Sequence, residues 1–403
     1  MVLDVSRGGP PPPPCCVRRG TSGTDPDVPL SPSTPRARCD VVVAAGTTVT
    51  LPPGPVEAAS VTVRGTLRWP ADAAAQLTTG FLVAEGPAGA VRIGTAAQPA
   101  APGSAVQVVD NGRAHSALGP LAVGAEGAGA RFDVHGAAKT PWALLAEPVF
   151  AGEAGADTLR LDRPLDGWRV GDRLALAPTV GPTVYGEGSK AETFEIRAIA
   201  GRTVTLDRGV AKSRAGYPAL RVQAEVLNLS RDVVLSGPAG QAQGLHSRIG
   251  HGAVGTVSYA RVEHCGQLGV AGKYCLHFHM SQACRDCVFR GNAIEHGSQR
   301  GIIVHGTHRS VVEDNVLYDL KGSYIYVEDG NEMENLFKNN VALCPVQGGC
   351  KTADGSTDND QADNIQQVRS PSPPRLPPPR PRVALMPFHD QHRPTSELIR
   401  RDV

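Results

Sequence analysis

Residues 288–306 read VFRGNAIEHGSQRGIIVHG, and residues 311–330 read VVEDNVLYDLKGSYIYVEDG. When these stretches are aligned with each other and with LFKNNVAL at 336–343, each row carries an asparagine at the same place: Asn292, Asn315 and Asn340. The steps are 23 residues (315 − 292) and 25 residues (340 − 315). A period of about 20–25 residues, with a polar side chain turned inward at each corner, is typical of the coils of a parallel β-helix.

The three asparagines are expected to be structural. Successive coils of a β-helix lie about 4.8 Å apart, so their side chains can bond to each other and to the corner backbone. Such bonds satisfy polar groups that would otherwise be buried without a partner.

The same alignment predicts a ladder of titratable side chains. At the 23-residue step His305 lies over Glu328, and the stretch GKYCLHFHM at 272–280 places His279 over His305. His277 faces the same side as His279, because side chains alternate along a strand. In this register His277 lies over Ile303 and then Tyr326, while the core-facing positions are Leu276, Phe278, Ile302 and Val304.

Two imidazoles and a carboxylate at about 5 Å spacing can bind a divalent cation or act as acid and base. The candidate metal ligands are His279, His305 and Glu328, with His277 beside them in the catalytic set. A packing and hydrogen-bonding stack under a covering loop is the alternative. Arg300 and Asp329 add charge at the coil rim, where Arg300 could pair with a substrate carboxylate or form an ordinary salt bridge.

Composition narrows the class of protein. The 40 Lys and Arg residues nearly balance the 39 Asp and Glu residues, so no basic excess indicates a nucleic-acid partner. With 46 glycines, 34 prolines and only 4% aromatic residues, the 403-residue chain favours many short strands with tight turns. No apolar run is long enough for a membrane span, and the N-terminus has no signal-peptide core.

The chain divides into five regions by pattern. Short strand bursts closed by glycine fill 39–128, longer strand pairs fill 129–243, and the β-helix repeats fill 244–350, where they end early. Residues 1–38 and 351–403 are rich in proline and lack periodicity, so they are predicted to be disordered or to reflect an incorrect gene structure.

Four of the nine cysteines lie within 265–287: Cys265, Cys275, Cys284 and Cys287. Disulfides or inert thiols are the favoured interpretation, and a structural metal site is the alternative.

The motifs GKYCLHFHM, QRGIIVHGTH and NVLYDLKGSYIYVEDGNEMENLFKNN, in this order, resemble the family of the cell migration-inducing hyaluronan-binding protein, its transmembrane relative and fibrocystin-like proteins. The stretch at 66–99 resembles the G8 domain that precedes their β-helix. The resemblance implies an all-β chain, with a G8-type domain at 39–128, a connecting β region at 129–243 and a right-handed parallel β-helix at 244–350.

The resemblance also implies a cell-surface or extracellular protein that interacts with glycans. Family members include enzymes that cleave hyaluronan, with which calcium has been associated, so calcium is the implied cofactor and an acidic polysaccharide the implied partner. By match to the GDR motif, Asp172 and Arg173 are further candidate catalytic residues. A turn pair is their structural alternative.

Two functions stay open. The first is a hyaluronidase-like enzyme that cleaves an acidic polysaccharide at the histidine ladder. The second is a non-catalytic binding or adhesion module. Gly322-Ser323-Tyr324, where relatives carry Gly-His-Gly, and the small net charge favour the second.

Overall fold

The structure is a computed structural model that describes residues 39–179, 191–220, 222–345 and 350. The expectations for 1–38 and 351–403 lie outside these residues. The described chain contains strands and a 3-10 turn at Pro218–Leu220, with no α-helix among its elements. The predicted all-β class is confirmed.

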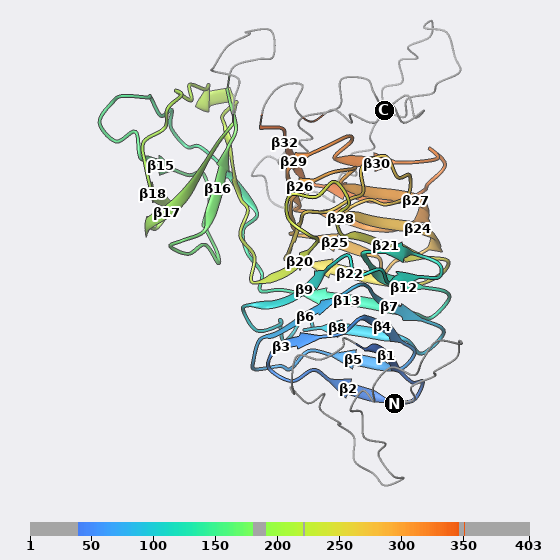
Figure 1. Ribbon diagram of the computed structural model, residues 1–403. Helices are drawn as coiled ribbons and strands as arrows, with labels where there is room; N and C mark the ends of the chain where they lie inside the picture. The colour runs from blue at the N-terminus through green and yellow to red at the C-terminus, as the bar shows by residue number, and fades with distance from the viewer. Residues whose placement is uncertain (1–38, 180–190, 221, 346–349, 351–403) are drawn as a thin grey trace, which may run out of the picture.

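Three eight-stranded parallel sheets, here sheets A, B and C, form the body of the molecule (Figure 1). Sheet A contains β1 (Asp40–Val43), β4 (Ser60–Val63), β7 (Leu82–Glu85), β12 (Ala122–Glu126), β21 (His246–Gly250), β24 (Leu276–Ala283), β27 (Ile302–His308) and β30 (Ile325–Val327). Sheet B contains β2 (Thr48–Thr50), β5 (Thr66–Arg68), β8 (Ala90–Ile93), β13 (Arg131–His135), β22 (Val254–Ser258), β25 (Val288–Arg290), β28 (Val311–Glu313) and β31 (Leu336–Lys338). Sheet C contains β3 (Gly54–Glu57), β6 (Ala75–Thr79), β9 (Ser104–Val108), β20 (Val233–Ser236), β23 (Ala260–Glu263), β26 (Ala293–Gly297), β29 (Val316–Leu320) and β32 (Val341–Leu343).

Each coil contributes one strand to each sheet, so the described strands build a parallel β-helix of eight coils. Alternate side chains point into the space between the sheets and form one continuous apolar core. In that core Phe278 on β24 stacks on Phe289 on β25 with ring centroids 3.8 Å apart. The register predicted for Leu276, Phe278 and His279 over Ile302, Val304 and His305 is confirmed.

The predicted asparagine ladder is also confirmed. Asn292 donates from its backbone and side-chain nitrogens to Oδ1 of Asn315, and Asn315 donates in the same way to Oδ1 of Asn340, at 2.9–3.0 Å. The Nδ2 groups also donate to strand carbonyls, including that of Phe289. The ladder therefore satisfies buried polar groups of three successive coils.

A single residue in the left-handed region turns the chain from sheet B to sheet C ahead of each ladder asparagine. The corner residues are Gly291, Asp314 and Asn339, with φ between 57° and 64°. Gly291 is required for space as well, because a Cβ there would lie 2.3 Å from the ring of Tyr259. These tight corners fix where each asparagine enters the core.

One such corner is replaced by a whole domain. Between β13 and β20 the chain forms an antiparallel sheet, here the accessory domain, in the order β14-β19-β16-β17-β18-β15 (Figure 1). Its strands are β14 (Trp142–Leu144), β15 (Thr158–Arg160), β16 (Arg173–Leu176), β17 (Glu192–Ala200), β18 (Thr203–Leu206) and β19 (Glu225–Asn228). Trp142 donates through Nε1 to the carbonyl of Asn339 at 2.9 Å, which ties the domain to the late coils.

The strands of 39–128 belong to the same three sheets as those of 244–343. A small hairpin, β10 (Ala114–His115) with β11 (Gly119–Pro120), interrupts them before β12. The G8-type region and the repeat region expected from the sequence are thus stacked parts of one β-helix. The early coils are shorter, with Asp40 paired to Ser60, and carry no asparagine repeat that would have revealed this.

Where both cysteines lie within the described residues, three disulfides join positions close in sequence: Cys265–Cys275, Cys284–Cys287 and Cys344–Cys350. The favoured disulfide interpretation therefore holds for the cluster at 265–287, and those four thiols are not available as ligands of a structural metal.

The described side chains also form an ion-pair network between the accessory domain and sheet C. Glu295 on β26 is fully buried and contacts Arg173 of β16 at 3.1 Å and Arg261 of β23 at 2.7 Å. His296 lies 3.5 Å from Glu295 and 3.0 Å from Asp319, and the hydrogen bond to Asp319 raises the pKa of His296. The pKa of Asp319 is lowered by the same bond.

We predict that His296→Gln destabilises the protein more at pH 5.5 than at pH 8.5. A raised folded-state pKa gives stability that is full below the unfolded value of 6.5 and is lost as pH rises through the folded value. Because both side chains are about one-third exposed, we expect a loss of about 0.5–1 kcal/mol at the lower pH. Urea unfolding at the two pH values measures it. Equal losses of stability at the two pH values would contradict a charged pair between His296 and Asp319.

Candidate functional site

A row of polar residues follows the outer side of sheet A from coil to coil, and we call it the sheet A row. The pairing places Glu85 beside Glu126, Glu126 beside Gly250, Gly250 beside His279 and His279 beside His305. Glu328 continues the row, since its backbone donates to Val304 at 3.0 Å and its carboxylate lies 3.6 Å from His305. The register predicted for His279, His305 and Glu328 is therefore present.

Three histidines converge within this row. The side chains of His277, His279 and His305 each present a ring nitrogen within 4.8 Å of the other two. The Nδ1 atoms of His279 and His305 lie 3.1 Å apart. Among the described residues these are the histidine, cysteine or carboxylate side chains close enough together to share one metal ion. The predicted ligand set differed, with Glu328 in place of His277.

His277 faces away from the core, as predicted, yet it is only 1% exposed. The segment 266–274 covers it, and the Cys265–Cys275 disulfide closes that segment. The Gly272 carbonyl lies 3.3 Å from Nδ1 of His277, and the ring of Tyr274 meets the imidazole edge-on at 5.0 Å. His277 thus forms the floor of the cluster, while His279 and His305 are partly exposed above it.

Burial keeps two of these imidazoles neutral. Desolvation, with repulsion from His279 and His305, holds the pKa of His277 well below its usual value. Desolvation, followed by the charges of His305 and Arg248, lowers the pKa of His279 to about 4. At neutral pH both rings carry a free lone pair, which suits them to bind a metal or accept a proton.

Carboxylates flank the cluster at both ends. On one side Asp329 lies 3.3 Å from Nε2 of His305. On the other, Glu126 contacts His251 and accepts a 2.8 Å hydrogen bond from Arg248, while the ring of His251 meets His279 edge-on at 5.4 Å. Sequence reasoning missed Glu126, Arg248 and His251, because no repeat joins β12 to β24 and only the fold brings them together.

Arg300 is not placed at the coil rim, where both sequence interpretations put it. Only 4% of it is exposed. Its guanidinium lies between the rings of Tyr274 and Tyr326, 5.4 Å and 4.6 Å from their centroids, and donates to the Tyr274 hydroxyl at 3.1 Å. This stack supports the wall beside His277, and pairing with a substrate carboxylate would require it to open.

Family models match two parts of the chain. Residues 29–146 match the G8 domain, and residues 242–375 match the CEMIP beta-helix.

The chain carries a G8 domain and a CEMIP beta-helix. The G8 domain supplies the first coils, and the CEMIP beta-helix supplies β24, β27 and β30 with the three histidines.

Curated relatives contain the same modules in longer chains. Human Fibrocystin-L is 26% identical over 261 residues, which cover 52% of this chain and 6% of that protein. Protein rliB of Dictyostelium discoideum is 26% identical over 243 residues, covering 58% of this chain and 21% of that protein. This chain therefore spans a small part of the relatives that it matches.

Solved structures with a similar trace include two phage tailspikes. The gp49 tailspike of Pseudomonas phage LKA1 is 13% identical, with a TM-score of 0.22, over 74% of this chain and 53% of that one. The gp54 tailspike of Acinetobacter baumannii phage AP22, solved with a capsular saccharide, is 10% identical, with a TM-score of 0.22, over 75% and 50%.

Asp172 and Arg173 lie on the accessory domain, not in the CEMIP beta-helix cluster. Asp172 is 7% exposed and accepts hydrogen bonds at 2.8 Å from both Lys139 and Asn228. Arg173 is directed at Glu295 on sheet C. Asp172 also accepts a hydrogen bond from the Arg169 backbone at 3.0 Å, as expected for the turn alternative, whereas Arg173 pairs across to sheet C and not within the turn.

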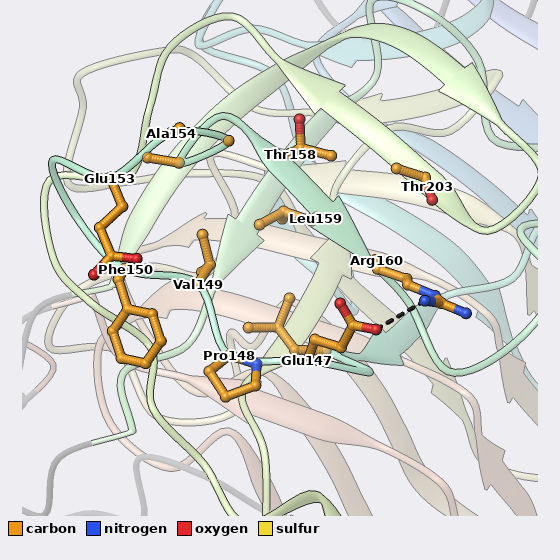
Figure 2. A pocket seen from close by; sticks show the side chains of 13 residues that line it. Glu147, Pro148, Val149, Phe150, Glu153, Ala154, Thr158, Leu159, Arg160 and Thr203 are labelled. Atoms are coloured by element: carbon orange, nitrogen blue, oxygen red, sulfur yellow. Dashed lines mark hydrogen bonds and ion pairs between the residues drawn. The ribbon is translucent and has the colours of Figure 1, made fainter.

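A hollow of about 400 Å³ lies on the accessory domain (Figure 2). Phe150 and Glu153 stand at one side, and the 2.8 Å ion pair between Glu147 and Arg160 closes the other. The hollow contains no histidine, so it is not the site predicted from the sequence.

Among the described residues, no helix is long and apolar enough to cross a membrane.

Proposed function

We propose that this chain binds an acidic polysaccharide of the hyaluronan type along the sheet A row. The observation that carries the proposal is the register of that row, in which Glu126, Gly250, His279, His305 and Glu328 follow one another from coil to coil. Neighbouring coils are about 4.8 Å apart, so the row presents a polar side chain on each coil from His279 to Glu328, and Glu126 presents another two coils before His279. A linear polymer laid along the β-helix axis meets these groups one after another.

Family membership supports a glycan as the partner, because the sequence resembles the hyaluronan-binding family in the segments that form the late coils. The disulfides support an oxidising compartment, so we place the protein outside the cell or at its surface. The row carries carboxylates and the neutral imidazole of His279, and the cation beside it is Arg248, which pairs with Glu126 and could meet a substrate carboxylate.

Cleavage of the bound polymer is the second candidate. The contact of His305 with Asp329 at 3.3 Å, with Glu328 3.6 Å away on the other ring nitrogen, favours it, because imidazoles and carboxylates are the usual groups for moving a proton to or from a sugar oxygen. Binding and cleavage are separable, since cleavage alone shortens the polymer.

We predict that the double variant His279→Ala, Glu328→Gln binds long hyaluronan at least about tenfold more weakly than the unchanged chain. It removes the two polar groups of the row on either side of His305 and leaves the core-facing side chains intact. Titration of labelled polymer with the purified chain measures the affinity, and gel electrophoresis of the polymer reports its length.

The matched control is Glu334→Gln, an exposed carboxylate outside the row that pairs with Arg309. It should bind like the unchanged chain. Equal weakening by the control and the double variant would place the site elsewhere. Shortening of the polymer by the unchanged chain would establish the enzyme, and unchanged length with saturable binding would establish the binding module.

A further inference from the structure

The ring nitrogens of the three-histidine cluster, two of which lie within hydrogen-bonding distance of each other in His279 and His305, are also placed to act as ligands. Nδ1 of His277 is directed at the Gly272 carbonyl at 3.3 Å, so that nitrogen carries the hydrogen of the neutral ring. Nε2 of the same ring is buried and has no hydrogen-bond partner. This nitrogen therefore has a lone pair available for an ion, and the three residues offer ring nitrogens within 4.8 Å of one another.

The spacing of the upper two rings fits a shared ion. Zinc–imidazole bonds are about 2.0–2.1 Å long, and two such bonds at a roughly tetrahedral angle place their nitrogens about 3.3 Å apart. The Nδ1 atoms of His279 and His305 are 3.1 Å apart. Small movements of the side chains would bring all three nitrogens to bonding distance.

A carboxylate stands where a metal-ligating histidine normally has one. With Nδ1 of His305 directed at the cluster, its Nε2 lies 3.3 Å from the carboxylate of Asp329. Metal-bound imidazoles commonly donate their second N–H to a carboxylate or a backbone carbonyl, which fixes the ring. Asp329 has this position for His305, and the Gly272 carbonyl has it for His277.

We propose that His277, His279 and His305 form a binding site for a divalent transition-metal ion of the zinc class. Three imidazoles suit zinc, copper, nickel or iron, whereas calcium takes six to eight oxygen ligands. The site thus differs from the sequence expectation in both ligand and ion: His277 takes the place of Glu328, and a transition metal takes the place of calcium. Three histidines also leave a position open for water or a sugar oxygen.

The test uses the full chain, stripped with chelator and dialysed, and two probes. Calorimetric titration with Zn²⁺ counts tight sites, and absorption spectroscopy with Co²⁺ reports whether the ion has nitrogen ligands in a tetrahedral arrangement. We expect one tight Zn²⁺ per chain, a tetrahedral Co²⁺ spectrum, and no comparable binding of Ca²⁺ at this site. His277→Gln and His305→Gln should each abolish the tight site and the spectrum.

The chain has twelve histidines, so the matched control is His308→Gln, which lies on the same strand as His305. It should keep the site. Asp329→Asn tests the carboxylate that contacts Nε2 of His305 and leaves the core side chains unchanged. It should weaken Zn²⁺ binding about 10–100-fold. The proposal would be overturned by any of three results: loss of the tight Zn²⁺ site in His308→Gln, retention of that site in both His277→Gln and His305→Gln, or an octahedral Co²⁺ spectrum. Because these readouts need no polysaccharide, a failure here is distinct from a failure of glycan binding.

Discussion

Replacing Asn315 by alanine is expected to lower the free energy of unfolding by about 3–5 kcal/mol. Its amide donates to Phe289 and Asn340, and its Oδ1 accepts from the backbone and side chain of Asn292. The substitution leaves several of these groups in the core without partners, at a cost of about 1–3 kcal/mol for each unsatisfied group. Chemical denaturation followed by circular dichroism measures the change.

Asn331, which is exposed on the turn after β30, provides the control, since Asn331→Ala should change stability by less than about 0.5 kcal/mol. A loss below about 1 kcal/mol for Asn315→Ala would mean that the ladder is not what satisfies these groups. The asparagines would then need another explanation than coil stacking.

Asp172→Ala should cost a similar amount, about 3–5 kcal/mol, although Asp172 was a catalytic candidate by family resemblance. Lys139, itself buried, donates to Asp172 at 2.8 Å. Removing one partner of a buried ion pair leaves the other charge uncompensated. Thermal and chemical unfolding measure the loss, and polysaccharide binding by the remaining folded protein should be unchanged.

Two further variants separate a structural role from a catalytic one. Asp166→Ala removes an exposed carboxylate of the same domain and should be nearly neutral. The double variant Lys139→Met, Asp172→Leu removes both charges and should recover much of the lost stability. If the double variant is stable but no longer binds the polymer, Asp172 takes part in function after all.

The late coils could be predicted in register because their signal is local. Asn292, Asn315 and Asn340 recur at nearly constant steps, and once they are aligned the strand period places His279 beside His305. The strand period did not, however, predict how far the side chains of His277 and Arg300 are exposed. The burial of His277 and Arg300 depends on the covering segment 266–274 and on the tyrosine stack, which follow from loop conformation and not from strand period.

The rest of the site arises from pairs that are distant in sequence. Glu126 and Arg248 meet because β12 pairs with β21, and they are separated by 122 residues because the accessory domain is inserted between β13 and β20. The sequence pattern showed a region of longer strand pairs at 129–243, but nothing in it marked that region as an insertion into a coil. For the same reason the early coils read as a separate domain.

The insertion has a consequence for the order in which the chain acquires structure during synthesis. Strand β9 pairs with β20, so Ser104 gains its partner only after Val233 has been synthesised. Each of the later coils, in contrast, pairs with a strand that follows about two dozen residues later. At about 5–20 residues per second, the 98 residues from His135 to Val233 (233 − 135) take roughly 5–20 s to emerge. During that interval the open edges of β9, β12 and β13 can pair with other chains. A nascent chain is thus most exposed to aggregation while its accessory domain is being made, and each later coil then covers the edge left by the one before.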